Sequence, residues 1–112
     1  MKGVKSKILR GDEFCPAQAT MELLGCRWTM QIVRALEPGV MRFNELAKSV
    51  GVNPRTLCTR LRRLEQDGIV ERRVVSAMPP NVEYELTAKG RALNEVLQRL
   101  IDWGATWMTD HQ

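Results

Sequence analysis

The chain has 112 residues, enough for one domain with a single modest core. Its 17 lysine and arginine residues outnumber 13 aspartate and glutamate residues, and the resulting net charge of +4 favours a polyanionic partner. No apolar run approaches the length of a membrane span, and the polar segment 1–14 lacks the apolar centre of a signal peptide. We therefore expect a cytoplasmic protein that has no membrane partner.

The chain begins with a polar segment, which we predict to be an N-terminal arm over residues 1–14. The domain proper is expected over 15–112. Its first helix should begin at Cys15-Pro16, because proline is favoured at the first position of a helix. Gly25 is expected to end this helix.

A second helix is predicted over 27–37. Apolar residues recur there at intervals of four, at Trp28, Ile32 and Leu36. Pro38-Gly39 then ends the periodic pattern.

The next segment has the layout of a helix-turn-helix. Residues 41–43 indicate a short strand and 44–49 a short helix. Gly51 permits the positive φ of a tight turn, and Asn53 is a favoured cap for a following helix that ends near Asp67.

The predicted helix after Asn53 has two different faces. At about 100° per residue, Leu57, Leu61 and Leu64 share one side. The residues opposite them are Arg55, Thr59, Arg62 and Gln66, with Arg63 beside them. Between Asn53 and Leu64 there are four arginines and no acidic residue. A basic helix alone is commonly just a solvated face, but here the turn and the charge agree with a helix that reads DNA.

Roles within this helix follow from how such helices contact DNA. The first residues of a recognition helix reach base edges, which assigns base readout to Arg55, Thr56 and Thr59. Phosphate contacts are expected from Asn53, Arg60, Arg62 and Arg63, with Arg42 as a weaker addition.

Two strands are predicted after this helix, over 69–76 and 82–87, joined by a stiff projecting loop at 77–81. A hairpin in this place is typical of a wing. Arg72 and Arg73 could contact phosphates or a minor groove from it, although strand arginines also serve as edge protection.

Thr87 is expected to cap a last helix that reaches about Met108, and 88–109 is interpreted as a dimerisation helix. At 1.5 Å per residue it would be about 33 Å long, longer than so small a core can cover. The residues expected at the dimer face are Leu93, Leu97, Leu100, Ile101, Trp103 and Trp107. The alternative is that Trp103 and Trp107 cover the core of their own monomer.

Several strings resemble the HxlR-type winged-helix regulators, a bacterial family related to the MarR type. They are Cys15-Pro16, Leu24-Gly25-Cys26-Arg27-Trp28, Arg42-Phe43-Asn44-Glu45-Leu46, Asn53-Pro54-Arg55-Thr56-Leu57, Leu61-Arg62-Arg63-Leu64-Glu65-Gln66-Asp67-Gly68-Ile69-Val70, Pro79-Pro80-Asn81-Val82-Glu83-Tyr84-Glu85-Leu86-Thr87 and Trp103-Gly104. The resemblance implies a winged helix-turn-helix, mainly α with a small β-hairpin wing, that dimerises through its terminal helices. It further implies a homodimer that binds palindromic operator DNA and usually represses.

The three cysteines, Cys15, Cys26 and Cys58, lack metal-ligand spacing, and with the single His111 they predict no metal site. Cys15 lies at a helix start, where the helix dipole favours a reactive thiolate, although Asp12 and Glu13 oppose this effect. The resemblance implies sensing of oxidants or electrophiles through Cys15. The alternative is a packing residue, the interpretation preferred for Cys26 and Cys58.

The sequence therefore predicts a DNA-binding transcriptional regulator that needs no cofactor. The alternative is a winged-helix protein-interaction module that does not touch DNA. No acid pair, nucleophile–histidine set or phosphate-binding glycine loop indicates an enzyme. No polar cluster indicates a small-molecule effector.

Overall fold

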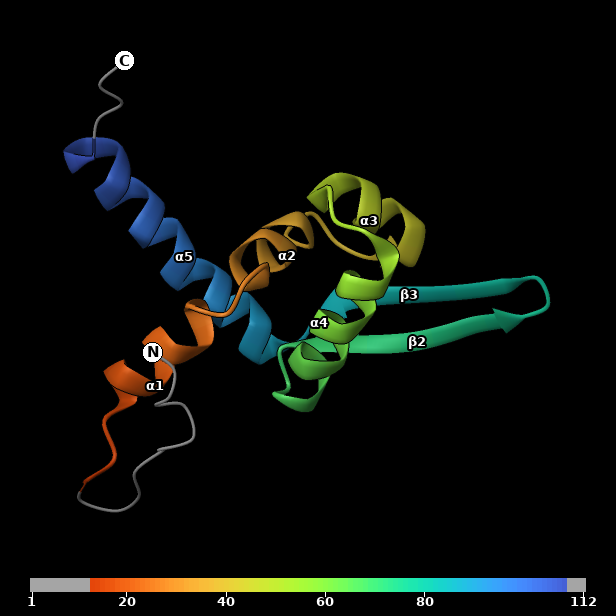
Figure 1. Cartoon of the computed structure of the whole chain (residues 1–112), viewed down its shortest axis with the longest axis horizontal. Coiled ribbons are helices and arrows are strands. Elements are labelled where there is room, and N and C mark those ends of the chain that lie inside the picture. Colours follow the sequence, from red (N-terminus) through yellow and green to blue (C-terminus); the bar gives the residue numbers. More distant parts are fainter. Residues whose placement is uncertain (1–12, 109–112) are drawn as a thin grey trace.

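The structure is a computed structural model that describes residues 13–108. Along this part of the chain the elements are α1 (Pro16–Leu24), α2 (Thr29–Ala35), β1 (Met41–Arg42), α3 (Phe43–Val50), α4 (Pro54–Gln66), β2 (Val70–Ala77), β3 (Pro80–Leu86) and α5 (Ala88–Trp107). The β2–β3 hairpin projects at one end of the molecule, and α5 extends at the other (Figure 1). This is the predicted winged helix-turn-helix. Most of the expected N-terminal arm, and His111, lie outside the described residues.

The predicted starts of α1 and α5 are confirmed, and each is marked by a proline or a capping residue. Cys15 precedes α1 in an extended conformation, and Pro16 occupies the first position. The Thr87 hydroxyl accepts a hydrogen bond from the Gly90 N–H at 3.0 Å and so caps α5. The prediction of a helix over 27–37 was too long, because Trp28 has a left-handed backbone with φ 74° and so stands outside α2.

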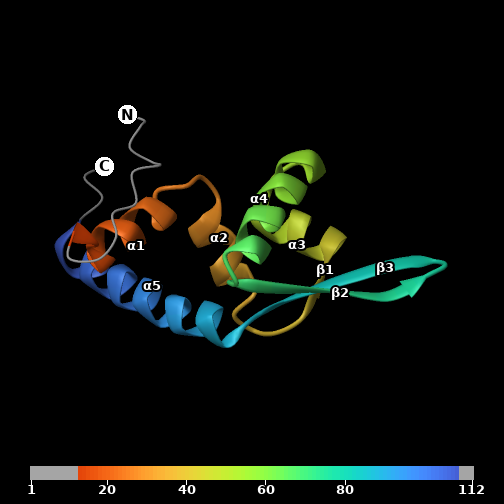
Figure 2. The ribbon, with the colours of Figure 1, turned by 90° about the horizontal axis from the view of Figure 1, so that it is seen from below.

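The sheet is antiparallel, with strand order β1-β3-β2. Phe43 belongs to α3 rather than to the short strand predicted over 41–43. The prediction of a projecting loop over 77–81 was also wrong. Ala77 pairs with Pro80, so the strands continue almost to the tip and only Met78 and Pro79 lie between them. The two strands of the wing therefore extend nearer to its tip, and the connection between them is shorter than expected (Figure 2).

One apolar core joins the elements. Its buried members are Ile32, Val33, Leu36, Leu46, Leu57, Leu61, Leu64, Ile69, Val70, Tyr84, Leu86, Leu93 and Leu97. Leu93 and Leu97 were expected at a dimer face, and this was wrong. They are buried in the core of their own chain, because the first half of α5 lies against α2 and the base of the wing. Periodicity alone could not separate this inward half of α5 from its outward half.

Helix α5 begins where the wing returns to the core. The Thr87 N–H donates to the Ile69 carbonyl at 3.0 Å, and the Thr87 hydroxyl donates to the Gly68 carbonyl. Gly90 lies so close to Ile69, the residue before β2, that an added Cβ would collide with the Ile69 carbonyl oxygen. The wing base and α5 therefore meet through backbone atoms.

None of the helices in the described residues is both long enough and apolar enough to cross a membrane.

We expect Gly90→Ala to lower the free energy of unfolding by about 3 kcal/mol, because the new methyl group meets a rigid backbone atom rather than a side chain. Glu95→Ala is the control in the same helix, since the Glu95 side chain is exposed. That control should be neutral or slightly stabilising. Urea unfolding measures both, and equal stability of the two variants would contradict the close contact.

Candidate nucleic-acid interface

The turn between α3 and α4 is fixed by two residues that the sequence identified. Gly51 ends α3 with a left-handed φ of 78°. Asn53 then starts α4, and its Oδ1 accepts a hydrogen bond from the Thr56 N–H at 2.9 Å. Because this oxygen is used as a helix cap, Asn53 contributes to the interface first by holding α4 in place.

Helix α4 has the predicted apolar and basic faces. Leu57, Leu61 and Leu64 are no more than 2% exposed. Arg55, Thr59, Arg62 and Arg63 are exposed, whereas Thr56 and Arg60 are half-buried at one flank of the helix. Arg63 Nε donates to Asp67 Oδ2 at 3.2 Å near the end of the helix. The inward leucines therefore determine which direction the arginines face.

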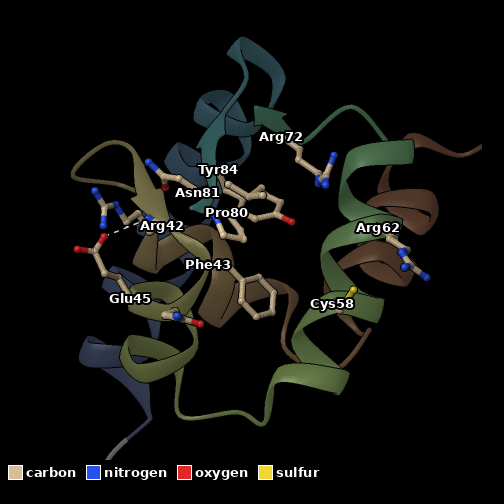
Figure 3. Close-up of a pocket in the computed structure, with 11 residues that line it drawn as sticks. Arg42, Phe43, Glu45, Cys58, Arg62, Arg72, Pro80, Asn81 and Tyr84 are labelled. Carbon is tan, nitrogen blue, oxygen red and sulfur yellow. Dashed lines mark hydrogen bonds between the residues drawn. The ribbon is translucent and has the colours of Figure 1, made fainter. Parts of the chain in front are cut away.

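A groove of about 620 Å³ lies between α3, α4 and the wing. Arg62 and Cys58 face it from α4, and Arg72 and Tyr84 face it from the wing (Figure 3). Burial raises the pKa of the Tyr84 hydroxyl, and the neighbouring Arg72 guanidinium opposes this shift. Arg42 lines the same groove, so the structure brings three of the predicted arginines to one surface.

The two wing arginines differ in their surroundings. Arg73 donates to Glu85 at 2.7 Å and contacts Glu71 at 3.2 Å, and its hydrogen bond holds the pKa of the Glu85 carboxyl below its ordinary value. Arg91 approaches the same Glu85 at 3.2 Å. Arg72 points the other way and forms no ion pair with any residue in 13–108. Arg72 is therefore the better placed of the two for an external anion.

Arg60 lies on the opposite flank of α4 from Cys58 and Arg62. It lines a second cavity together with Asn53 and Thr56, and with Arg27 from the segment between α1 and α2. The sequence reasoning missed Arg27, because it lies outside the helix-turn-helix and 33 positions before Arg60. The only feature of the sequence that marks Arg27 is the aromatic residue Trp28 directly after it.

The second half of α5 leaves large apolar side chains in solvent. Trp103 and Trp107 are 58% and 69% exposed, so they do not cover the core of their own chain. Leu100 and Ile101 are also exposed, and α1 has no buried residue. The protein therefore has an extended apolar surface that its own described residues leave uncovered.

The three thiols occupy different positions. Cys15 is exposed immediately before α1, and Cys58 is half-buried in the groove beside α4. The expectation that Cys26 is a packing residue was wrong, because it is exposed and its thiol reaches the Glu22 carbonyl at 3.5 Å. All three are free cysteines.

Comparisons with known proteins agree with this architecture. The family model of the HxlR-like helix-turn-helix matches residues 23–112. The HTH-type transcriptional regulator YdeP of Bacillus subtilis is 40% identical over 96 residues, which cover 83% of this chain and 75% of YdeP.

Two solved structures are similar over most of the chain. The reduced form of the transcriptional regulator YodB from B. subtilis is 37% identical, with a TM-score of 0.76, and the match covers 85% of this chain and 95% of that one. The redox regulator HypR in its reduced form is 35% identical, with a TM-score of 0.75 and coverage of 82% and 92%. YodB has also been solved after diamide treatment and with bound quinone. This chain belongs to the HxlR-like helix-turn-helix family of transcriptional regulators.

Proposed function

We propose that the protein is a homodimeric repressor that binds a palindromic operator in duplex DNA. The observation that carries the proposal is α4, a helix pinned to the core by three leucines with an exposed face of arginines and no acidic residue from Asn53 to Leu64. A surface that binds only other proteins does not require a helix face with four arginines and no acidic residue. DNA, with two rows of phosphates beside each groove, matches it.

The side chains divide by position along and around α4. Arg55, Thr56 and Thr59 lie in the first half of the helix and are assigned to base edges. Arg60, Arg62 and Arg63 are assigned to phosphates, joined by Arg42 and Arg72 across the groove. Arg73 is a lesser contributor, because its guanidinium is engaged by two carboxylates.

A second copy of the chain is the proposed occupant of the exposed apolar surface of α5, with α1 contributing. A twofold pair would present two α4 helices to successive major grooves about 34–36 Å apart on one side of the duplex. Binding by such a pair favours an operator whose two halves are related by the same symmetry. Repression then follows where an operator overlaps a promoter.

Cys15 is proposed as the site at which oxidants or electrophiles regulate binding. It is exposed at the start of α1, next to the surface assigned to the dimer. YodB and HypR, the similar regulators, have been studied in redox-treated or redox-defined forms. Diamide would oxidise the Cys15 thiols of the two proposed subunits to a disulfide while being reduced to the hydrazine, and a quinone would add to one Cys15 thiol and leave a thioether on the resulting hydroquinone. Either product at Cys15 would alter the packing of α1 on a partner.

Arg55→Ala should weaken binding to the preferred duplex by about 1–3 kcal/mol and weaken binding to random duplex much less, because a base contact carries sequence information. Arg63→Ala is the matched control, since loss of a phosphate contact weakens both duplexes alike. Gel shifts across a salt series measure the two. An equal loss on both duplexes for Arg55→Ala would reassign it to a phosphate.

Replacing both Trp103 and Trp107 by serine should raise the dimer dissociation constant about 30-fold or more, because a buried interface tryptophan commonly contributes about 2 kcal/mol or more. Val74→Ser removes a similarly exposed apolar side chain, 57% exposed, from the wing and should have no effect. Sedimentation equilibrium measures the constant. A wild-type monomer, or an unchanged constant in the tryptophan variant, would contradict this dimer.

Cys15→Ser should abolish release from DNA by diamide or quinone while leaving binding under reducing conditions intact. Cys58→Ser is the control that should retain the response, because this thiol lies in the groove beside α4, away from the proposed dimer contact of α1. Fluorescence anisotropy of a labelled duplex follows release directly. Normal release from the Cys15→Ser protein would remove Cys15 from the regulatory mechanism.

A further inference from the structure

The cavity on the second flank of α4 has the chemistry of an anion site. It has a volume of about 370 Å³. Its lining residues are Arg27, Trp28, Gly51, Val52, Asn53, Thr56 and Arg60. Two of these carry a positive charge and none carries a negative one. The cavity therefore combines cations from two segments far apart in the sequence.

Arg60 enters this cavity with an unmet hydrogen-bonding requirement. Its Nε is buried, and no acceptor for it lies among residues 13–108. A buried donor without an acceptor is costly, so a shift of this side chain that brings its guanidinium to an oxygen of a ligand would be favoured. Arg60 forms no ion pair within that part of the chain.

Arg27 is held at the other wall by stacking rather than by an ion pair. Its guanidinium carbon lies 5.0 Å from the centre of the Trp28 ring. A guanidinium that stacks on an aromatic face keeps its N–H groups directed outward in its plane. The left-handed backbone of Trp28, at φ 74°, is unusual for a bulky residue and marks a locally constrained segment at this point.

The start of α4 itself adds little to the site. Pro54 has no N–H, and the Thr56 N–H already donates to Asn53 Oδ1 at 2.9 Å. The positively charged donors at the cavity are the two guanidinium groups. An anion with several oxygen acceptors, such as a phosphate, fits two such forks better than a halide or a single carboxylate.

We propose that Arg27 and Arg60 clamp one backbone phosphate of duplex DNA. This inference rests on the proposed function, which places α4 in the major groove. The groove beside the wing, with Arg62 and Arg72, lies on the opposite flank of the same helix. The two flanks then face the two strands that border a major groove about 12 Å wide. Arg27 thereby extends the DNA surface to the segment between α1 and α2, beyond the helix-turn-helix.

The test compares Arg27→Gln, Arg60→Gln and the wild-type full chain on two duplexes, one selected from a random pool and one random. Each variant should bind both duplexes about tenfold more weakly and show a salt slope reduced by about one. Arg99→Gln, which removes an exposed charge from α5, is the matched control and should bind as the wild type does. Thermal melts verify that each variant is folded.

A methylphosphonate scan of the selected duplex identifies the contact. One neutral linkage should weaken the wild type clearly more than it weakens Arg27→Gln or Arg60→Gln, because each variant has already lost one of the two contacts to that phosphate. Wild-type affinity and salt slope in both variants would overturn the clamp while leaving the proposed function intact. A wild type without salt-dependent duplex binding would overturn both.

A last comparison distinguishes a backbone phosphate from a free one. Melting in inorganic phosphate and in chloride at matched ionic strength should show no selective stabilisation that depends on Arg27 or Arg60. Selective stabilisation of the wild type by inorganic phosphate, together with unaltered DNA binding by the variants, would assign the cavity to a free anion and overturn the proposal.

Discussion

The packing of Leu57, Leu61 and Leu64 against the core is the contact on which the DNA-facing surface depends. These side chains are buried almost completely, and each such burial contributes about 1.5–3 kcal/mol. Because they lie on one side of α4, they fix the rotation of the helix about its axis. The same rotation directs Arg55 and Arg62 outward and turns the two flanks toward their separate cavities. Apolar packing therefore determines where the positive charge of α4 lies.

A second constraint connects the wing with α5. Thr87 caps α5 and also donates a hydrogen bond to the Gly68 carbonyl in the turn between α4 and β2, while Gly90 allows backbone contact with Ile69. The element assigned to dimerisation is thus attached rigidly to the base of the wing. In the proposed dimer, a change in how the two α5 helices pack would alter the separation of the two α4 helices. That mechanical link gives a modification near α1 and α5 a physical route to DNA affinity.

The features that could be predicted from the sequence are those set by residues close together along the chain. Caps and breakers such as Pro16, Gly51 and Asn53 placed most helix starts and the turn correctly, and periodicity oriented α4. Features that depend on distant contacts were missed. The sequence did not distinguish the half of α5 that packs on the core from the half that is exposed, because its apolar pattern continues without a break. Arg27 was missed because only tertiary packing brings it to the same cavity as Arg60. The tight wing tip likewise depends on the pairing of Ala77 with Pro80.

We propose that α4, flanked by its two cavities, is the part of the chain that enters DNA. A titration of the ¹⁵N-labelled protein with duplex DNA, followed by amide chemical shifts, tests this residue by residue. We expect the largest changes on residues 53–63, further changes at Arg27 and Arg72, and no change at residues 100–107. Changes confined to α1 and the end of α5, with α4 unperturbed, would contradict it.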